Sequence, residues 1–113
     1  MYIDRGEIEE YPFTGVFTTT ETDTSKPLDE QVEEVVEVLR TVCDIQESSK
    51  DLSGGITASY AIYFPFDKTK GIVLKNGMEF AADMYGFRVN GEVRGIFPSQ
   101  MGGCVAYITD KNI

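Results

Sequence analysis

Apolar and polar residues alternate along most of this chain with the period of two that is typical of β-strands. Residues 13–20 are β-branched and aromatic, which favours a strand. In residues 56–64 one parity is apolar or aromatic throughout, so we expect a half-buried strand with that face toward the core; its residues are Ile56, Ala58, Tyr60, Ile62 and Phe64. Pro65 would end that strand, because proline cannot donate a backbone hydrogen bond to a neighbouring strand.

Asn-Gly pairs mark the tightest turns that this pattern predicts. Residues 85–97 hold two alternating runs joined by Asn90-Gly91. Both residues of such a pair accept positive φ, so a tight hairpin is predicted there. Asn76-Gly77 is a second candidate turn. The remaining short strands are expected at residues 72–74, 78–81 and 104–109.

Residues 28–46 fit two different periods. The apolar residues at helical spacing are Val32, Val35, Val36, Leu39 and Cys43. Against a helix, the segment is rich in β-branched residues, and residues 38–45 alternate at period two. We therefore favour a long strand over residues 34–46 after a short helical turn at most, with a helix as the alternative.

These elements together predict an all-β fold, because about six or seven short strands are separated by turns at intervals of roughly eight to twelve residues. We expect a small antiparallel β-barrel or sandwich with long polar loops at residues 21–27 and 47–55, and with room for one short helix. Residues 1–12 are expected to form an N-terminal arm, and residues 13–113 a single barrel domain. A chain of 113 residues suits one hydrophobic core.

The negative charge of the chain is concentrated in its first part. Residues 1–47 contain 13 acidic and 3 basic residues, a net charge of −10, whereas residues 48–113 contain 6 and 7, a net charge of +1. The resulting total of −9 argues against sequence-specific nucleic-acid binding, which needs a basic surface. It suits a basic protein partner, a surface past which DNA moves, or simply a solvated acidic face.

The sequence contains little that catalysis needs. It has no histidine, and carboxylate pairs such as Glu9-Glu10 and Glu33-Glu34 lie in polar runs where ionised, solvated side chains are the rule. Zinc, calcium and phosphate-binding spacings are missing from the sequence. We therefore expect no enzymatic activity, no cofactor and no metal.

Cys43 and Cys104 each lie in an apolar run, where a reduced, buried cysteine is expected. The sequence has neither an apolar run of about 18 residues nor a basic-then-apolar leader. We expect a soluble, unprocessed protein without a membrane partner.

The order of strands and turns resembles that of the small head-closure, or stopper, proteins of tailed bacteriophages, and more generally of minor virion proteins of the head–tail connector. The resemblance covers about nine-tenths of the chain as a pattern and is carried by the runs at residues 11–14, 41–46, 60–65, 76–80 and 93–108. It implies a small β-barrel decorated by long loops that assembles as a ring beneath the portal and adaptor. Such a ring closes the filled head and offers a docking surface for the tail.

The resemblance also implies partners, a location and candidate surfaces. The partners would be portal-type or adaptor-type proteins, tail proteins and further copies of the chain, and the location would be the virion, after synthesis in the cytoplasm of a host bacterium. The candidate assembly contacts are Tyr2, Ile3, Ile8 and Tyr11. The candidate channel-facing residues, in polar loops past which DNA would slide, are Thr22, Asp23, Glu47 and Asp51.

Two other functions remain compatible with the sequence. An acidic inhibitor that mimics DNA would occupy the basic cleft of a nucleic-acid enzyme and would bind it with strongly salt-weakened affinity. A generic β-barrel interaction module is the other alternative.

Overall fold

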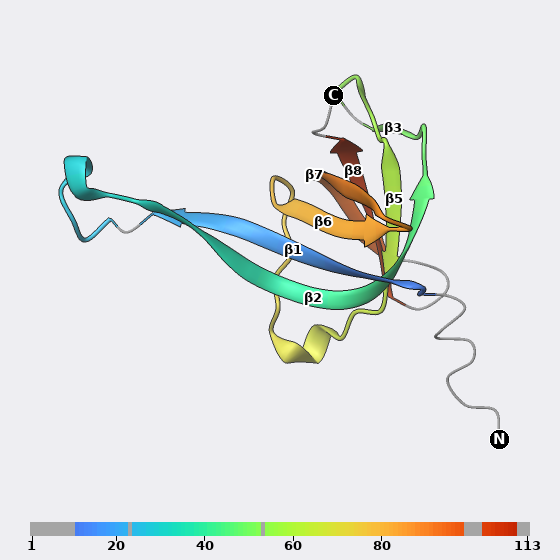
Figure 1. Cartoon of the computed structure of the whole chain (residues 1–113), viewed down its shortest axis with the longest axis horizontal. Helices are drawn as coiled ribbons and strands as arrows, with labels where there is room; N and C mark the ends of the chain where they lie inside the picture. The colour runs from blue at the N-terminus through green and yellow to red at the C-terminus, as the bar shows by residue number, and fades with distance from the viewer. Residues whose placement is uncertain (1–10, 23, 53, 99–102, 111–113) are drawn as a thin grey trace.

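A computed structural model describes residues 11–22, 24–52, 54–98 and 103–110. These residues form an all-β fold whose main sheet closes into an antiparallel barrel with the strand order β1-β2-β5-β8-β7-β6 (Figure 1). The barrel strands are β1 (Phe13–Thr22), β2 (Glu33–Glu47), β5 (Tyr60–Phe64), β6 (Glu79–Met84), β7 (Phe87–Pro98) and β8 (Cys104–Asp110). The other elements are a small sheet of β3 (Asp51–Leu52) and β4 (Ile56–Thr57), and the 3-10 turns η1 (Leu28–Glu30) and η2 (Lys68–Lys70). The predicted small antiparallel barrel is therefore confirmed.

Aromatic and aliphatic side chains of one parity fill the barrel. Phe17 lies between Phe64 and Phe80, with both pairs of ring centroids 5.0 Å apart. The other fully buried side chains of this core include Ile62, Val93, Ile108 and Cys43. Burial of these large apolar surfaces is the main stabilising term for a domain of this size.

The structure resolves the ambiguity of residues 28–46 in favour of the strand. β2 runs for 15 residues from Glu33 to Glu47 and pairs with β1 along most of its length. Helical geometry is limited to the three residues of η1, which precede it. The density of valine explains this outcome, since β-branched side chains lose rotamer freedom in a helix and pack well on a sheet.

The turn predicted at Asn90-Gly91 is wrong. Both residues lie inside β7, where Asn90 pairs with Ala81 and Gly91 pairs with Phe80. The hairpin turn is at Tyr85-Gly86, whose φ values of 52° and 86° give the two positive angles that a primed turn requires. Gly91 serves close packing instead, because a Cβ atom there would collide with the backbone carbonyl of Thr109.

Three smaller expectations also need correction. Residues 72–74 form no strand and belong to an irregular connection between η2 and β6. The strand expected at residues 56–64 is interrupted at Ala58-Ser59, where the backbone of Ser59 bonds to Ser48 and Ile108. The polar loops are shorter than expected, because residues 21 and 22 belong to β1, Glu47 ends β2, and β3 lies within residues 47–55.

Cys43 and Cys104 are not joined by a disulfide in the structure. Cys43 is fully buried, whereas Cys104 is half-buried. Burial, with a smaller contribution from the neighbouring charge of Asp44, raises the pKa of the Cys43 thiol to about 12. Cys43 thus behaves as a small core residue and is not poised as a nucleophile.

Candidate functional site: a projecting hairpin and a groove at its base

The β1–β2 hairpin extends beyond the barrel. Pairing between β1 and β6 ends at Thr18, whereas pairing between β1 and β2 continues to Thr22 and Glu33. Segment 19–36 is here called the projecting hairpin. Its described residues leave the barrel, and residues 19–22 and 33–36 form a two-stranded ribbon (Figure 1). The molecule measures 57 × 35 × 28 Å with a radius of gyration of 15.7 Å, against about 13 Å for a compact domain of roughly 100 residues.

A β-bulge lies at the base of the projecting hairpin. Phe17 pairs with Leu39 and Thr18 pairs with Glu37, so Val38 is an extra residue on β2. A bulge bends its strand and increases the local twist. The extra residue also shifts the alternation of β2 by one position. Odd-numbered residues such as Cys43 face the barrel interior on the barrel side of the bulge, but beyond it, along the ribbon, the odd-numbered residues face the opposite side.

Large apolar side chains lie exposed on and beside this ribbon. Leu28, Val32 and Val35 are 86%, 64% and 73% exposed. An isolated two-stranded ribbon is marginally stable in water, because it buries neither of its faces. These exposed apolar residues on an unsupported ribbon therefore indicate a surface that a partner covers.

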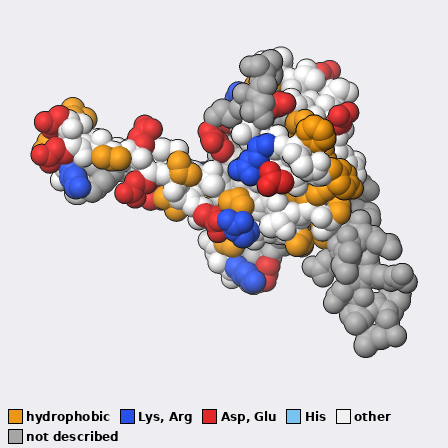
Figure 2. All heavy atoms as spheres, in the orientation of Figure 1, with side chains coloured by type: hydrophobic (Ala, Val, Ile, Leu, Met, Phe, Trp, Pro, Cys, Tyr) orange, Lys and Arg blue, Asp and Glu red, His pale blue; other side chains and the backbone are white. Residues whose placement is uncertain are grey.

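The projecting hairpin is strongly acidic. Residues 19–36 contain 6 acidic residues and 1 lysine, a net charge of −5. Figure 2 shows acidic side chains along its length and at its tip. Glu21 and Glu34 lie directly opposite each other on the two strands, and neither forms an ion pair with any described residue. Because like charges placed opposite each other destabilise a strand pair, this arrangement favours a cationic partner.

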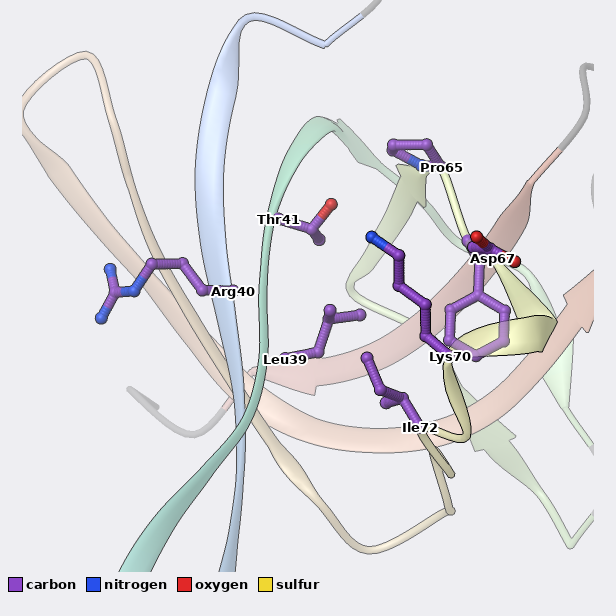
Figure 3. Close-up of a pocket in the computed structure, with 8 residues that line it drawn as sticks. Leu39, Arg40, Thr41, Pro65, Asp67, Lys70 and Ile72 are labelled. Atoms are coloured by element: carbon purple, nitrogen blue, oxygen red, sulfur yellow. The ribbon is translucent and has the colours of Figure 1, made fainter.

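A groove lies beside the base of the hairpin, between β2 and the connection that carries η2. Its volume is about 380 Å³, and its lining includes Leu39, Thr41, Pro65, Phe66, Asp67, Lys70 and Ile72. In Figure 3 the side chains of Leu39, Lys70 and Ile72 gather on one side of β2, and Arg40 points to the other side. Arg40 also lines the groove through β2, but the charged side chains on the groove side are those of Lys70 and Asp67, beside the apolar walls.

Hydrogen bonds hold the aspartate of this groove in place. Asp67 accepts bonds from the hydroxyl and the backbone N–H of Thr69, at 2.6 and 2.9 Å. These two bonds, with a smaller contribution from the charge of Lys70, lower the pKa of Asp67. Lys70 forms no salt bridge with any described residue, so its charge is available to a ligand at the groove.

A second depression lies on the other face of β1 and β2 and differs in its electrostatics. It is lined in part by Arg40, Asp83 and Arg88. Arg40 pairs with Glu37 at 2.7 Å, and Arg88 pairs with Asp83 at 3.4 Å. Both cations are thus already partnered within the chain, which leaves the groove with Lys70 as the better site for an acidic ligand.

Of the candidate assembly contacts, the structure describes only Tyr11, which is half-buried just before β1. Tyr2, Ile3 and Ile8 lie outside the described residues, as does most of the expected N-terminal arm. Asp23, one of the candidate channel-facing residues, also lies outside them.

The described candidate channel-facing residues are not brought together. Thr22 is exposed on the projecting hairpin, whereas Glu47 and Asp51 are exposed at the other end of β2 and in β3 (Figure 1). The two groups lie at opposite ends of a 15-residue strand, which spans up to about 46 Å at roughly 3.3 Å per residue. Within one molecule they cannot form a single surface.

Sequence reasoning missed the exposed apolar residues of the hairpin and the groove at its base. A signal for the hairpin was present, because the strand predicted over residues 34–46 is about twice as long as a typical strand. Such a strand cannot be covered along its whole length by the short strand predicted next to it. For the groove, the sequence holds no comparable signal, since Leu39 and Lys70 meet only through the tertiary fold.

Comparisons with known proteins return no match among protein-family models, curated proteins or solved structures. Within the described ranges, no three or more His, Cys, Asp or Glu residues gather in a way that would hold a metal ion. The part of the chain that the structure describes contains no helix with the length and apolarity to cross a membrane.

Proposed function

We propose that this protein is a structural subunit of a bacteriophage head–tail connector, in a head-closure (stopper) or adaptor ring. It acts through protein–protein contacts that surround the DNA channel. The observation that carries this proposal is the projecting hairpin, an acidic ribbon with exposed apolar residues on a closed barrel. The resemblance of the chain to stopper proteins gives the proposal its biological setting.

A ring of identical subunits needs two different surfaces on each subunit, because each copy contacts its two neighbours in different ways. The projecting hairpin is suited to be one of them. Its four residue pairs beyond the barrel, from Thr19–Val36 to Thr22–Glu33, add roughly 13 Å of reach at about 3.3 Å per residue. Its negative charge would also keep it from binding the phosphates of passing DNA.

The alternative of a DNA-mimicking inhibitor fits the acidic ribbon less well. A surface that imitates phosphates gains little from large apolar side chains among its carboxylates, yet Leu28, Val32 and Val35 are all exposed on or next to the ribbon. Exposed apolar residues bordered by charge are typical of a protein-docking surface.

The test is removal of the gene from the bacteriophage or prophage that encodes it. We expect DNA-filled heads without tails, together with free, complete tails, because the missing subunit would join the two. Purified protein added to the mutant extract should restore infectious particles and should be found in them by mass spectrometry.

Two controls make this test specific. The purified barrel without residues 19–36 should enter no particles, because the assembly surface is missing. Mutant particles that are complete and infectious would overturn the proposal. Salt-sensitive inhibition of a basic nuclease by the purified protein would instead support the DNA-mimic alternative.

A further inference from the structure

We propose that the projecting hairpin of one molecule docks in the groove at the hairpin base of a second copy of the same chain. Leu28 and Val32 of the hairpin would pack on the apolar walls of the groove, and the acidic residues beside them would face Lys70. This inference rests on the proposed function, in that it names the contact through which the ring subunits join.

Charge complementarity supports a second copy as the occupant. The projecting hairpin has a net charge of −5. Residues 65–75, which form one wall of the groove, contain 3 lysines and 1 aspartate, a net charge of +2. Asp67 is committed to Thr69, so Lys70 is the charged side chain of this wall that can meet the hairpin. Asp29 and Glu30 of η1 directly follow Leu28, so docking of Leu28 brings carboxylates to the groove.

The apolar chemistry of the two surfaces also matches. Leu39, Phe66 and Ile72 give the groove apolar walls, and its volume of about 380 Å³ lies in the range of roughly 300–1,000 Å³ that holds bound groups in proteins. Leu28 and Val32 are among the most exposed apolar residues of the described chain. Burial of a leucine and a valine contributes binding energy that does not depend on salt.

The hairpin cannot occupy the groove of its own molecule. Leu39 and Thr41, which line the groove, belong to the same strand that continues into the hairpin as far as Glu33. The tip is therefore held away from the groove by the extended ribbon between them (Figure 1). Since hairpin and groove are different surfaces, docking between copies is heterologous and leads to a ring or a filament.

The experiment uses two variants of the full chain. Leu28→Ser/Val32→Ser removes the apolar side chains of the hairpin, and Lys70→Glu reverses the charge of the groove. The wild-type chain should form oligomers larger than a dimer in analytical ultracentrifugation at concentrations up to about 1 mM. At the concentration at which half of the wild-type chain is assembled, each variant alone should stay largely monomeric, because one of the two surfaces that every contact needs is weakened. Lys70→Glu acts more strongly than screening by salt, because it makes the groove repel the acidic hairpin.

A mixture of the two variants should form a heterodimer and nothing larger. In that mixture the intact hairpin of the Lys70→Glu chain can enter the intact groove of the Leu28→Ser/Val32→Ser chain. The groove of the first chain and the hairpin of the second chain are defective, so no further copy can be added. Native mass spectrometry resolves this species by mass. The triple variant Asp29→Lys/Glu30→Lys/Lys70→Glu should regain the larger oligomers, because the charges of both surfaces are exchanged.

Matched controls separate docking from general effects. Val73→Ser removes an apolar side chain that is 60% exposed and belongs neither to the hairpin nor to the groove lining. Lys75→Glu reverses a charge on the same connection, also outside the groove lining. Both control chains should assemble as the wild type does. Circular dichroism should show that every variant keeps the barrel.

A wild-type chain that is monomeric up to about 1 mM would overturn the docking proposal, as would oligomers that survive in both variants. These outcomes differ from failure of the proposed function. If the chain assembles through the hairpin and the groove but its deletion leaves the virus intact, the connector function is wrong and the docking stands. If deletion separates heads from tails while the docking variants remain infectious, the docking alone is wrong.

Discussion

At Gly91 two neighbouring strands approach so closely that no side chain fits. A Cβ atom on Gly91 would meet the backbone carbonyl of Thr109 in β8, and a backbone atom cannot move away as a flexible side chain can. Gly91→Ala should therefore destabilise the protein by about 1–3 kcal/mol, the usual cost of overpacking. The measurement is the free energy of unfolding in urea, compared with the wild type.

The neighbouring residue provides the control for Gly91→Ala. The side-chain oxygen Oδ1 of Asn90 is buried and has no hydrogen-bond partner. Removal of this oxygen by Asn90→Ala therefore leaves no described donor unsatisfied. Asn90→Ala should change stability by less than about 1 kcal/mol. A Gly91→Ala chain as stable as the wild type would contradict the strand register that places Gly91 against β8.

Cys43 should make stability depend on pH in the alkaline range. Burial raises the pKa of Cys43 from its ordinary value of 9.0 to about 12, so the folded state retains a thiol proton that the unfolded state loses above about pH 9. This contribution is fully present below pH 9 and is lost as the pH rises toward 12, at up to about 1.4 kcal/mol per pH unit. Urea unfolding between these pH values measures it.

The Cys43→Ala variant is the reference for this prediction, because tyrosines and lysines also titrate above pH 9. The variant should be less stable at neutral pH, since it leaves a small cavity in the core, but its stability should fall less steeply with alkaline pH. Parallel curves for the two proteins would show that Cys43 retains an ordinary pKa in the fold.

Among the elements, the projecting hairpin should be separable from the barrel. Thr18 and Glu37 are directly paired, so a two-residue Asn-Gly turn can join them in place of residues 19–36. The shortened chain should keep the strand signature in circular dichroism, because the buried core lies entirely outside the removed residues. Its radius of gyration should fall from 15.7 Å toward the roughly 13 Å of a compact domain, as measured by X-ray scattering.

The shortened chain should also lose self-association, since it keeps the groove but has no hairpin to place in it. A chain with a scrambled hairpin sequence of the same length and composition is the control for reach and charge. If the shortened chain unfolds, the ribbon is required for the barrel to form, and the division between barrel and hairpin is wrong.

Elements were predictable from sequence where the alternation is strong and packing agrees with it. β2 could be recognised because its valines oppose a helix, and β8 because it is a short run rich in β-branched and aromatic residues. The turn at Tyr85-Gly86 could not, because Asn90-Gly91 offers the better local turn chemistry. The close approach of Gly91 to Thr109 outweighs the preference of Asn90-Gly91 for a turn. This contact forms between β7 and β8 in the closed barrel, so the local sequence does not predict it.

The candidate site was less predictable than the fold. The acidity of the first 47 residues was evident, but not its concentration on a ribbon that leaves the barrel. That depends on where β6 and β5 stop pairing with β1 and β2, and strand ends are set by the packing of the whole barrel. The groove combines residues about 30 positions apart, such as Leu39 and Lys70, which no local pattern connects.

At the scale of whole molecules, association should weaken with salt but should not disappear. The proposed contact combines acidic residues facing Lys70 with apolar burial of Leu28 and Val32. Raising the ionic strength from about 0.1 M to about 1 M shortens the screening length from about 10 Å to about 3 Å and removes most of the attraction between exposed charges. Exposed ion pairs are worth only about 0.2–1 kcal/mol each, so the association constant should fall by about tenfold or less.

Analytical ultracentrifugation across this salt range measures the association constant. The association constant of the Leu28→Ser/Val32→Ser chain gives the contribution of the charges without the two apolar side chains. Residual association at high salt is expected only where the apolar side chains are present, because apolar burial is not screened. Complete loss of wild-type association at high salt would mean that charge alone joins the copies. Leu28 and Val32 would then need a different partner, and the acidic ribbon would fit the DNA-mimic alternative better than a subunit of a ring.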